Sequence, residues 1–316
     1  MTHNIPTSSR SHRNAVLLAL FVTFLWSTSW VLIKIGLKSS LPPVTFAGLR
    51  YTLAFLCLLP FVLLNSTHRK MIRNLSKTNW WQLALLGLIF YSITQGAQFI
   101  GLAFLPAATV TLLLNFSPIL VALSSGNMNK EATTLAQWGG IILSVLGAII
   151  YFLPLNIPAG QSIGLLAVII GVLANASSSL LGRTLNTQEG LPAILITTIS
   201  MGIGGVLLLL VGAFVQGFGK LALQQWLIIA WLAVVNTAIA FTLWNKSLQT
   251  LTAVESSIIN GSMLPQIAIL AWLLLDEPLN LRQTLGLGLV SVGILIVQVW
   301  RGKLNQIRDG TIEQSK

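Results

Sequence analysis

Long apolar stretches alternate with short polar connections along almost the whole chain. A helix needs about 20 apolar residues to cross the hydrocarbon layer of a membrane, and ten stretches reach or approach that length. The pattern therefore predicts an all-α membrane protein with ten transmembrane helices. We place them near residues 14–36, 42–64, 79–101, 105–126, 133–153, 161–181, 191–215, 223–245, 252–275 and 281–300.

The positions of the basic residues predict how these helices are oriented. Cytoplasmic connections of membrane proteins carry an excess of Lys and Arg. With a cytoplasmic N-terminus, thirteen of the 18 Lys and Arg residues lie inside and three outside, while Lys34 and Arg50 lie within predicted helices. We therefore expect two cytoplasmic tails, residues 1–13 and 301–316, as an even number of crossings requires.

The composition supports a membrane protein over other classes. Hydrophobic residues make up 54% of the chain and charged residues only 8%, whereas about a quarter of an ordinary soluble domain is charged. The net charge of +11 does not indicate nucleic-acid binding, because the basic residues form short clusters between apolar runs and not one basic face. We expect the lipid bilayer, and no nucleic acid, as a partner.

Signatures of catalysis and metal binding are absent from the sequence. His3, His12 and His68 lie outside the predicted helices, and no His, Cys and Asp cluster has the spacing of metal ligands. The chain also lacks HExxH, GxSxG and Walker-type phosphate-loop motifs. We expect no enzyme activity, no metal and no cofactor.

Two stretches of the chain repeat the same residues in the same order. Two prolines stand 147 positions apart, and the residue pairs that follow them stand 146 apart. The pairs are Pro118 and Pro265, Glu131 and Glu277, Leu135 and Leu281, Gln137 and Gln283, Gly140 and Gly286, and Gly147 and Gly293. We interpret residues 14–153 and 161–300 as duplicated halves. Five helices per half is an odd number, so the halves would form inverted-topology repeats, as is typical of secondary transporters.

The first two predicted helices add residues that fit a known pattern. Residues 26–30 read Trp-Ser-Thr-Ser-Trp and are followed by Lys34-Ile35-Gly36. Pro43 lies at the start of the second predicted helix, and Arg50 lies within it. Together with the duplicated stretches, this ordered set resembles the ten-helix EamA-like branch of the drug/metabolite transporter superfamily over roughly residues 14–300. The resemblance implies a bacterial inner-membrane carrier with a central cavity lined by helices 1, 3, 4, 6, 8 and 9. This sequence departs from the family pattern at Leu264, a position where family members often carry a glutamate.

Two prolines near mid-helix predict local breaks. Proline has no backbone N–H, so Pro118 and Pro265 should free the carbonyls of Leu114 and Gly261. Asn115 and Ser262 lie beside these carbonyls at matched positions of the two halves. Such polar spots are tolerated in a membrane only where they are buried or face water. The two sites are therefore substrate contacts or purely structural kinks.

Polar and aromatic side chains on common helix faces are the other candidates. Tyr91, Gln95 and Gln98 follow an i, i+4, i+7 spacing, which places them on one face for substrate contact or for interhelical hydrogen bonds. The residues expected to contact substrate are Trp26, Ser29, Trp30, Lys34, Tyr91, Gln95, Gln98, Asn115, Asn175, Trp244 and Ser262.

Three charged residues within predicted helices allow more than one interpretation. Lys34 could hold a substrate carboxylate, lie over an aromatic ring, or extend to water at the helix end. Arg50 could cap carbonyls, pair across helices or meet a substrate anion. Glu255 is an acid inside a span and hence a candidate for ion coupling, but it lies about one turn from the cytoplasmic end, where an interfacial ion pair with Lys246 is the simpler explanation.

These observations predict a secondary transporter of small polar metabolites such as amino acids. It would act as an exporter or exchanger by alternating access, in the bacterial inner membrane, as a monomer or homodimer. The alternatives are a passive channel and a lipid or drug flippase on the same fold.

Overall fold

The computed structural model describes residues 9–38, 41–129, 134–153, 159–187, 191–219, 221–248, 250–251 and 259–314. Within these ranges the chain is helical almost throughout and contains no strand. Glu255 lies outside the described residues, as does most of the connection before α14.

Helices occupy the segments that the apolar pattern predicts, and some segments hold two or three helical elements. The elements up to residue 152 are α1 (Ser9–Lys38), α2 (Pro43–Leu63), α3 (Ser66–Arg73), α4 (Lys77–Leu86), η1 (Gly87–Thr94), α5 (Gln95–Phe104), α6 (Ala107–Leu114), α7 (Ser117–Asn129) and α8 (Leu135–Phe152). Those after residue 158 are η2 (Ala159–Gln161), α9 (Ser162–Thr187), α10 (Ala193–Val215), α11 (Leu223–Ala233), η3 (Val234–Ile239), α12 (Ala240–Leu248), α14 (Met263–Leu275) and α15 (Leu281–Gln314).

Apolar helices of membrane-spanning size account for most of the described chain. Six helices are long and apolar enough to cross a bilayer, and four shorter apolar helices accompany them. The shorter ones are Ala107–Val121, Leu223–Ile239, Ile259–Leu275 and Leu281–Val297. The protein is therefore a multi-pass, all-helical membrane protein.

Local sequence explains where two matched helices begin. Thr134 and Gln137 form a reciprocal capping box at the start of α8: the Thr134 hydroxyl accepts from the Gln137 N–H, and the Gln137 amide oxygen accepts from the Thr134 N–H. Asn280 and Gln283 make the same reciprocal pair of bonds at the start of α15. The duplicated glutamines thus cap equivalent helices, 146 positions apart.

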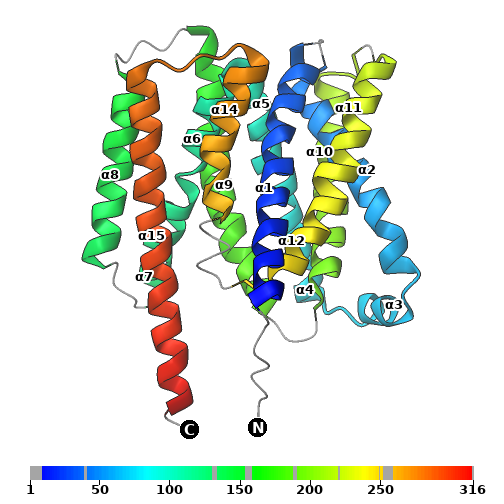
Figure 1. Ribbon diagram of the computed structural model, residues 1–316. Coiled ribbons are helices and arrows are strands. Elements are labelled where there is room, and N and C mark those ends of the chain that lie inside the picture. The colour runs from blue at the N-terminus through cyan, green and yellow to red at the C-terminus, as the bar shows by residue number, and fades with distance from the viewer. Residues whose placement is uncertain are drawn as a thin grey trace.

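The helices assemble into a bundle with two paired edges (Figure 1). α8 packs along α15 at one edge, and α2 packs along α10 at the other. Between them, α1 packs against α12 and α14, while α9 packs against α5, α6 and α7. The start of α1 and the end of α15 lie at the same end of the bundle (Figure 1). We call the opposite end, where α14 passes into α15, the α14–α15 end.

Four glycines allow α8 and α15 to approach closely. A Cβ on Gly140 would lie 2.7 Å from the Gly293 carbonyl oxygen, and one on Gly147 would lie 2.8 Å from the Gly286 carbonyl oxygen. Both distances are far below van der Waals contact, so a larger residue would force the helices apart. The two contacts are reciprocal, because Gly140 matches Gly286 and Gly147 matches Gly293 in the duplicated sequence.

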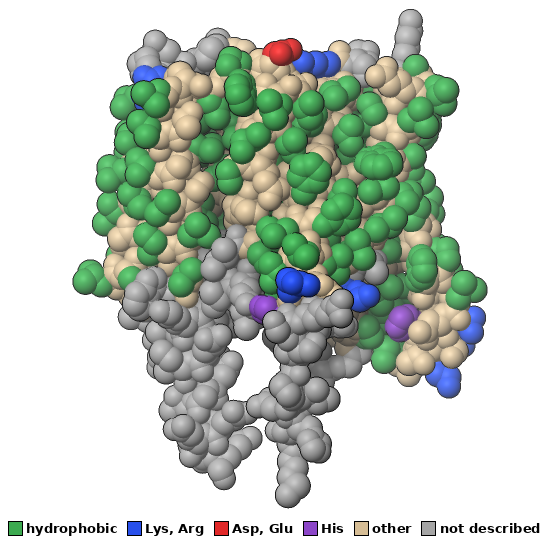
Figure 2. Space-filling view, in the orientation of Figure 1, with side chains coloured by type: hydrophobic (Ala, Val, Ile, Leu, Met, Phe, Trp, Pro, Cys, Tyr) green, Lys and Arg blue, Asp and Glu red, His purple; other side chains and the backbone are tan. Residues whose placement is uncertain are grey.

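The outer surface of the bundle is apolar (Figure 2). Hydrophobic side chains (green) cover the side of the molecule, and the charged side chains drawn in blue and red lie toward its two ends. Phe61, Phe214 and Ile142 are examples of large apolar residues that are exposed on this surface. A belt of this kind is what a lipid-facing surface requires.

Candidate functional site

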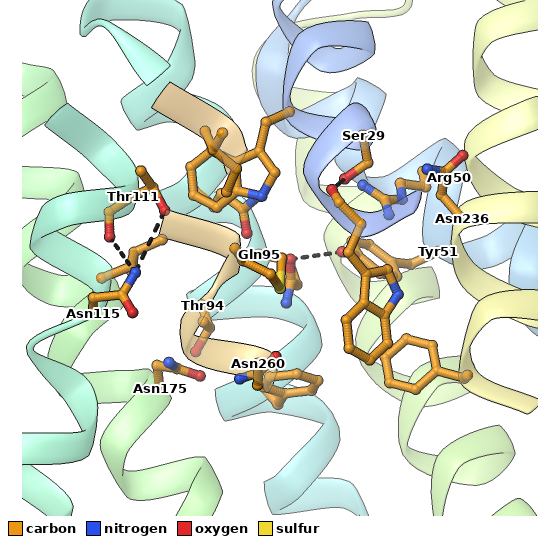
Figure 3. A pocket seen from close by; sticks show the side chains of 18 of the residues that line it. Ser29, Arg50, Tyr51, Thr94, Gln95, Thr111, Asn115, Asn175, Asn236 and Asn260 are labelled. Atoms are coloured by element: carbon orange, nitrogen blue, oxygen red, sulfur yellow. Dashed lines mark hydrogen bonds between the residues drawn. The ribbon is translucent and has the colours of Figure 1, made fainter. Parts of the chain in front are cut away.

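A cavity of about 330 Å³ lies at the centre of the bundle and is partly polar (Figure 3). Its walls come from α1, α2, η1, α5, α6, α7, α9, η3, α12, α14 and the residues just before α14. The lining side chains are Trp26, Ser29, Trp30, Arg50, Tyr51, Phe90, Thr94, Gln95, Gln98, Thr111, Leu114, Asn115, Pro118, Asn175, Asn236, Phe241, Asn260, Met263 and Ile267.

Helix α1 contributes an aromatic wall. Trp26 and Trp30 lie one turn apart, and Ser29 between them donates a hydrogen bond to the Trp26 carbonyl at 2.6 Å. The Trp26 ring packs against Phe241 and Trp244, with centroids 5.3 and 5.2 Å apart. Trp244 therefore supports the wall from behind and does not line the cavity itself.

The fourth predicted span is broken beside the cavity. α6 ends at Leu114, α7 begins at Ser117, and Pro118 supplies no N–H for the Leu114 carbonyl. Asn115 lies between the two helices, and its side-chain amide nitrogen donates a hydrogen bond to the Thr111 carbonyl at 2.8 Å. The cavity thus borders a stretch of irregular backbone, which a membrane tolerates where that backbone lines a cavity.

A matching irregularity precedes α14, in the other half of the sequence. Ser262 stands in a turn three residues before Pro265, as Asn115 does before Pro118. However, Ser262 does not line the cavity: its hydroxyl donates to the Ile259 carbonyl at 2.6 Å and accepts from the Gln266 amide nitrogen at 2.9 Å. Gln266 also accepts a hydrogen bond from Ser27 at 3.0 Å and so ties α14 to α1.

Two π-helical segments interrupt the α-helices that carry cavity residues. η1 begins at Gly87 and η3 at Val234, 147 positions later. In each, a threonine hydroxyl donates to the carbonyl five residues back, from Thr94 to Ile89 at 2.9 Å and from Thr237 to Leu232 at 2.8 Å. Such π-segments occur frequently at functional sites.

Two glutamines reach the cavity directly after η1. Gln95 accepts a hydrogen bond from the Tyr51 hydroxyl at 2.6 Å, and Gln98 lines the same wall. Tyr91 does not line the cavity. It is buried behind that wall, with its ring against Tyr51 and Phe90.

Arg50 enters the cavity wall from α2. Its side chain is 5% exposed, and its Nε donates to the Thr237 hydroxyl at 3.2 Å. The guanidinium carbon lies 5.2 Å from the centroid of the Tyr51 ring. The family resemblance implied a cavity lined by helices 1, 3, 4, 6, 8 and 9, and therefore not by the second helix. The second helix, α2, nevertheless contributes Arg50 and Tyr51 to the lining.

Lys34 lies outside the cavity. Its ammonium forms an ion pair with Glu277, with Nζ and Oε1 3.1 Å apart, and this partner was not among the three alternatives that the sequence left open. The other oxygen of Glu277 accepts from the Ala107 N–H at 2.7 Å, so the acid caps α6.

The structure therefore brings seven of the expected contact residues to one cavity, namely Trp26, Ser29, Trp30, Gln95, Gln98, Asn115 and Asn175. It places four elsewhere, namely Lys34, Tyr91, Trp244 and Ser262. Pro118 lines the cavity and Pro265 does not. Sequence reasoning did not select Tyr51, Thr94, Asn236 or Asn260, which also line it.

A partly polar cavity within an apolar helical bundle is typical of a membrane transporter, and sequence comparison agrees. The model of the EamA-like transporter family matches residues 13–153 and again residues 162–299. The chain belongs to the EamA-like transporter family. The family and its named relatives indicate a transporter and not an enzyme.

Relatives across bacteria carry transporter names. An uncharacterized transporter of Bacillus subtilis, YvbV, is 28% identical over 295 residues, covering 90% of this chain and 91% of its own. A transporter of Chlamydia trachomatis named for S-adenosylmethionine and S-adenosylhomocysteine is 25% identical over 299 residues, covering 90% and 88%. The inner membrane transporter YedA of Escherichia coli is 24% identical over 295 residues, covering 88% and 89%.

A solved crystal structure has the same fold. It matches with a TM-score of 0.63 at 16% identity, covering 91% of this chain and 98% of the other. At that identity the likeness concerns the fold alone.

Proposed function

We propose that the protein is a secondary transporter that moves small polar metabolites across the membrane by alternating access through the central cavity. One observation carries the proposal: both halves of the sequence contribute polar walls to one cavity. Gln95 and Asn115 come from the first half, and Asn175, Asn236 and Asn260 come from the second. Rocking of the halves against each other would expose this cavity to either side in turn.

The packing of α8 on α15 supports two inverted repeats, residues 14–153 and 161–300. In a two-fold interface, residue i contacts j and the partner's j contacts i. Gly140 faces Gly293 and Gly147 faces Gly286, which is this reciprocity for positions matched by the duplication. The two helices run antiparallel, so a two-fold axis perpendicular to them would relate the pair, as inverted topology requires.

Ten crossings with both tails cytoplasmic fit the same proposal. The six long and the four shorter apolar helices together equal the ten crossings proposed. The start of α1 and the end of α15 share one end of the bundle (Figure 1). The distribution of basic residues favours a cytoplasmic location for that end, and a relative named as an inner membrane transporter supports a bacterial inner membrane.

The cavity favours substrates of the size and polarity of amino acids and their nucleoside conjugates. Amide and hydroxyl groups would orient the substrate, and Trp26 and Trp30 would supply stacking area. The Chlamydia relative is named for a substrate of this kind, an amino acid joined to a nucleoside.

Uptake into proteoliposomes tests this function. Purified protein would be reconstituted, and entry of labelled amino acids and S-adenosylhomocysteine measured against protein-free vesicles. We expect saturable entry of at least one compound that competes with its unlabelled form. Entry that rises linearly with concentration, with no competition, would indicate a channel.

A further inference from the structure

Arg50 is the one charged side chain among the described residues that line the cavity. The remaining lining side chains are uncharged: aromatic, aliphatic, thioether, hydroxyl or amide groups. The two acids whose side chains are described, Asp276 and Glu277, lie at the α14–α15 end, and Glu277 is paired with Lys34. Within the described part of the chain, the cavity therefore carries a positive charge that no acid balances.

The guanidinium of Arg50 also has unused hydrogen-bonding capacity. Arginine carries five N–H donors and stays protonated in proteins. Its Nε donates to Thr237, which holds the side chain by one donor, and the Tyr51 ring offers a weaker contact at 5.2 Å. Among the described residues, the terminal nitrogens have no hydrogen-bond partner. The side chain lies beside Ser29 and Asn236 at the cavity wall (Figure 3).

A purely structural role accounts poorly for this placement. A buried charge without a counter-charge is strongly unfavourable, and charged groups at membrane depth generally face partners or a water-filled path. A neutral side chain could pack against Tyr51 without that penalty. The uncompensated charge is explained if its partner arrives with the substrate.

We infer that Arg50 binds the carboxylate of the transported substrate. One guanidinium balances one negative charge, and its planar fork matches the two oxygens of a carboxylate. Thr237 and Tyr51 hold the side chain in position. Asn115, Asn175 and Thr111 on the opposite wall are left to bind the rest of the substrate (Figure 3). This inference rests on the proposed function and narrows its substrate class to carboxylates, including zwitterions.

Release of compounds from an unselected metabolite pool tests the inference, because it does not require the substrate to be chosen in advance. Proteoliposomes would be loaded with a bacterial metabolite extract, and released compounds identified by mass spectrometry against protein-free vesicles. We expect the released compounds to carry a carboxylate. For each, the unlabelled free acid, added outside together with the labelled compound, should inhibit entry of the label at least tenfold more strongly than its carboxamide does, with S-adenosylhomocysteine and its carboxamide as a defined pair.

Variants then assign the effect to Arg50. Arg50→Gln should lower release of these compounds at least tenfold, and Arg50→Lys should retain part of it, because the charge remains. Arg69→Gln makes the same change at an exposed position on α3 and should release at the wild-type rate. Size-exclusion profiles and thermal unfolding check that each variant is folded, and the acid-against-amide comparison on wild-type protein does not depend on any variant.

The outcomes separate the two claims. Release of neutral, cationic or phosphate-only compounds, equal inhibition by acid and amide, or wild-type release by folded Arg50→Gln would each overturn the role of Arg50 while leaving a transporter. Absence of any protein-dependent release would overturn the proposed function, and the carboxylate site with it.

Discussion

Lys34 and Glu277 form an ion pair across the two halves of the sequence, with Nζ and Oε1 3.1 Å apart. Lys34 lies one turn beyond Trp30 in α1, between the cavity wall and the α14–α15 end. Glu277 follows α14 and also caps α6 through the Ala107 N–H. A single acid thus fastens α1, α6 and α14 together on one side of the cavity.

Loss of this pair should favour opening of the cavity toward the α14–α15 end. We expect Glu277→Ala to lower the free energy of unfolding by about 1–2 kcal/mol, because it removes both the ion pair and a helix cap. Lys34→Met should have the smaller effect, since the cap remains. The opening is measured by labelling Gln98→Cys, in a Cys57→Ser background, with an impermeant maleimide added at that end. Unchanged labelling in both variants would rule out a closing role for the pair.

The close contact of α8 and α15 predicts a sharp difference between neighbouring glycines. Gly286→Ala should destabilise the protein by about 1–3 kcal/mol, because the new methyl would meet the Gly147 carbonyl oxygen at 2.6 Å. Gly288→Ala is the matched control, since a Cβ there meets no atom within 4 Å and alanine favours helix. Thermal unfolding in detergent measures both. Equal effects of the two substitutions would contradict the close packing.

Cavity amides should matter for transport and not for folding. Single substitutions Gln98→Ala and Asn115→Ala should each lower transport about tenfold by removing a polar group available to the substrate. Asn74→Ala, at an exposed position after α3, is the control. Transport rates would be compared at equal amounts of reconstituted protein. Normal rates in both cavity variants would mean that the substrate follows another path.

Glu255 remains a candidate for coupling transport to a proton gradient. If it carries the coupling proton, Glu255→Gln should abolish stimulation by a pH gradient and leave exchange of substrate for substrate intact. The two modes would be measured in the same vesicles, with and without the gradient. Gradient stimulation that survives in the variant would exclude this role.

Hydropathy predicted where the apolar helices lie among the described residues, because a helix in lipid must satisfy its backbone hydrogen bonds within one apolar segment. The same reasoning located much of the cavity. Gln95, Gln98, Asn115 and Asn175 lie in apolar predicted spans, where a polar side chain is stable only if it faces the interior. Their positions therefore followed from local sequence.

Tyr91 shows where helical spacing misleads. An i, i+4, i+7 pattern puts Tyr91 on one face with Gln95 and Gln98 only if the helix is regular. Tyr91 lies in η1, whose wider turn changes the phase of the side chains before Gln95. The hydroxyl bond from Thr94 to Ile89 accompanies this turn, and the spacing of polar residues along the chain does not reveal it.

Lys34 and Arg50 show a second limit, which concerns distant partners. Lys34 meets Glu277, and Arg50 meets Thr237, from the other half of the sequence. Hydropathy detects that a charge stands in an apolar helix but not which residue faces it. Both side chains were therefore left with open alternatives until the packing of the helices was known.

Counterflow in proteoliposomes tests the central claim, alternating access, most directly. Vesicles would be loaded with unlabelled substrate, and entry of the labelled form would be followed with an equal total concentration on both sides. We predict that internal substrate accelerates entry of the label, because each return of the loaded cavity presents it again to the outside. Entry at the same rate into loaded and empty vesicles, without saturation, would contradict a carrier and point to a continuous pore.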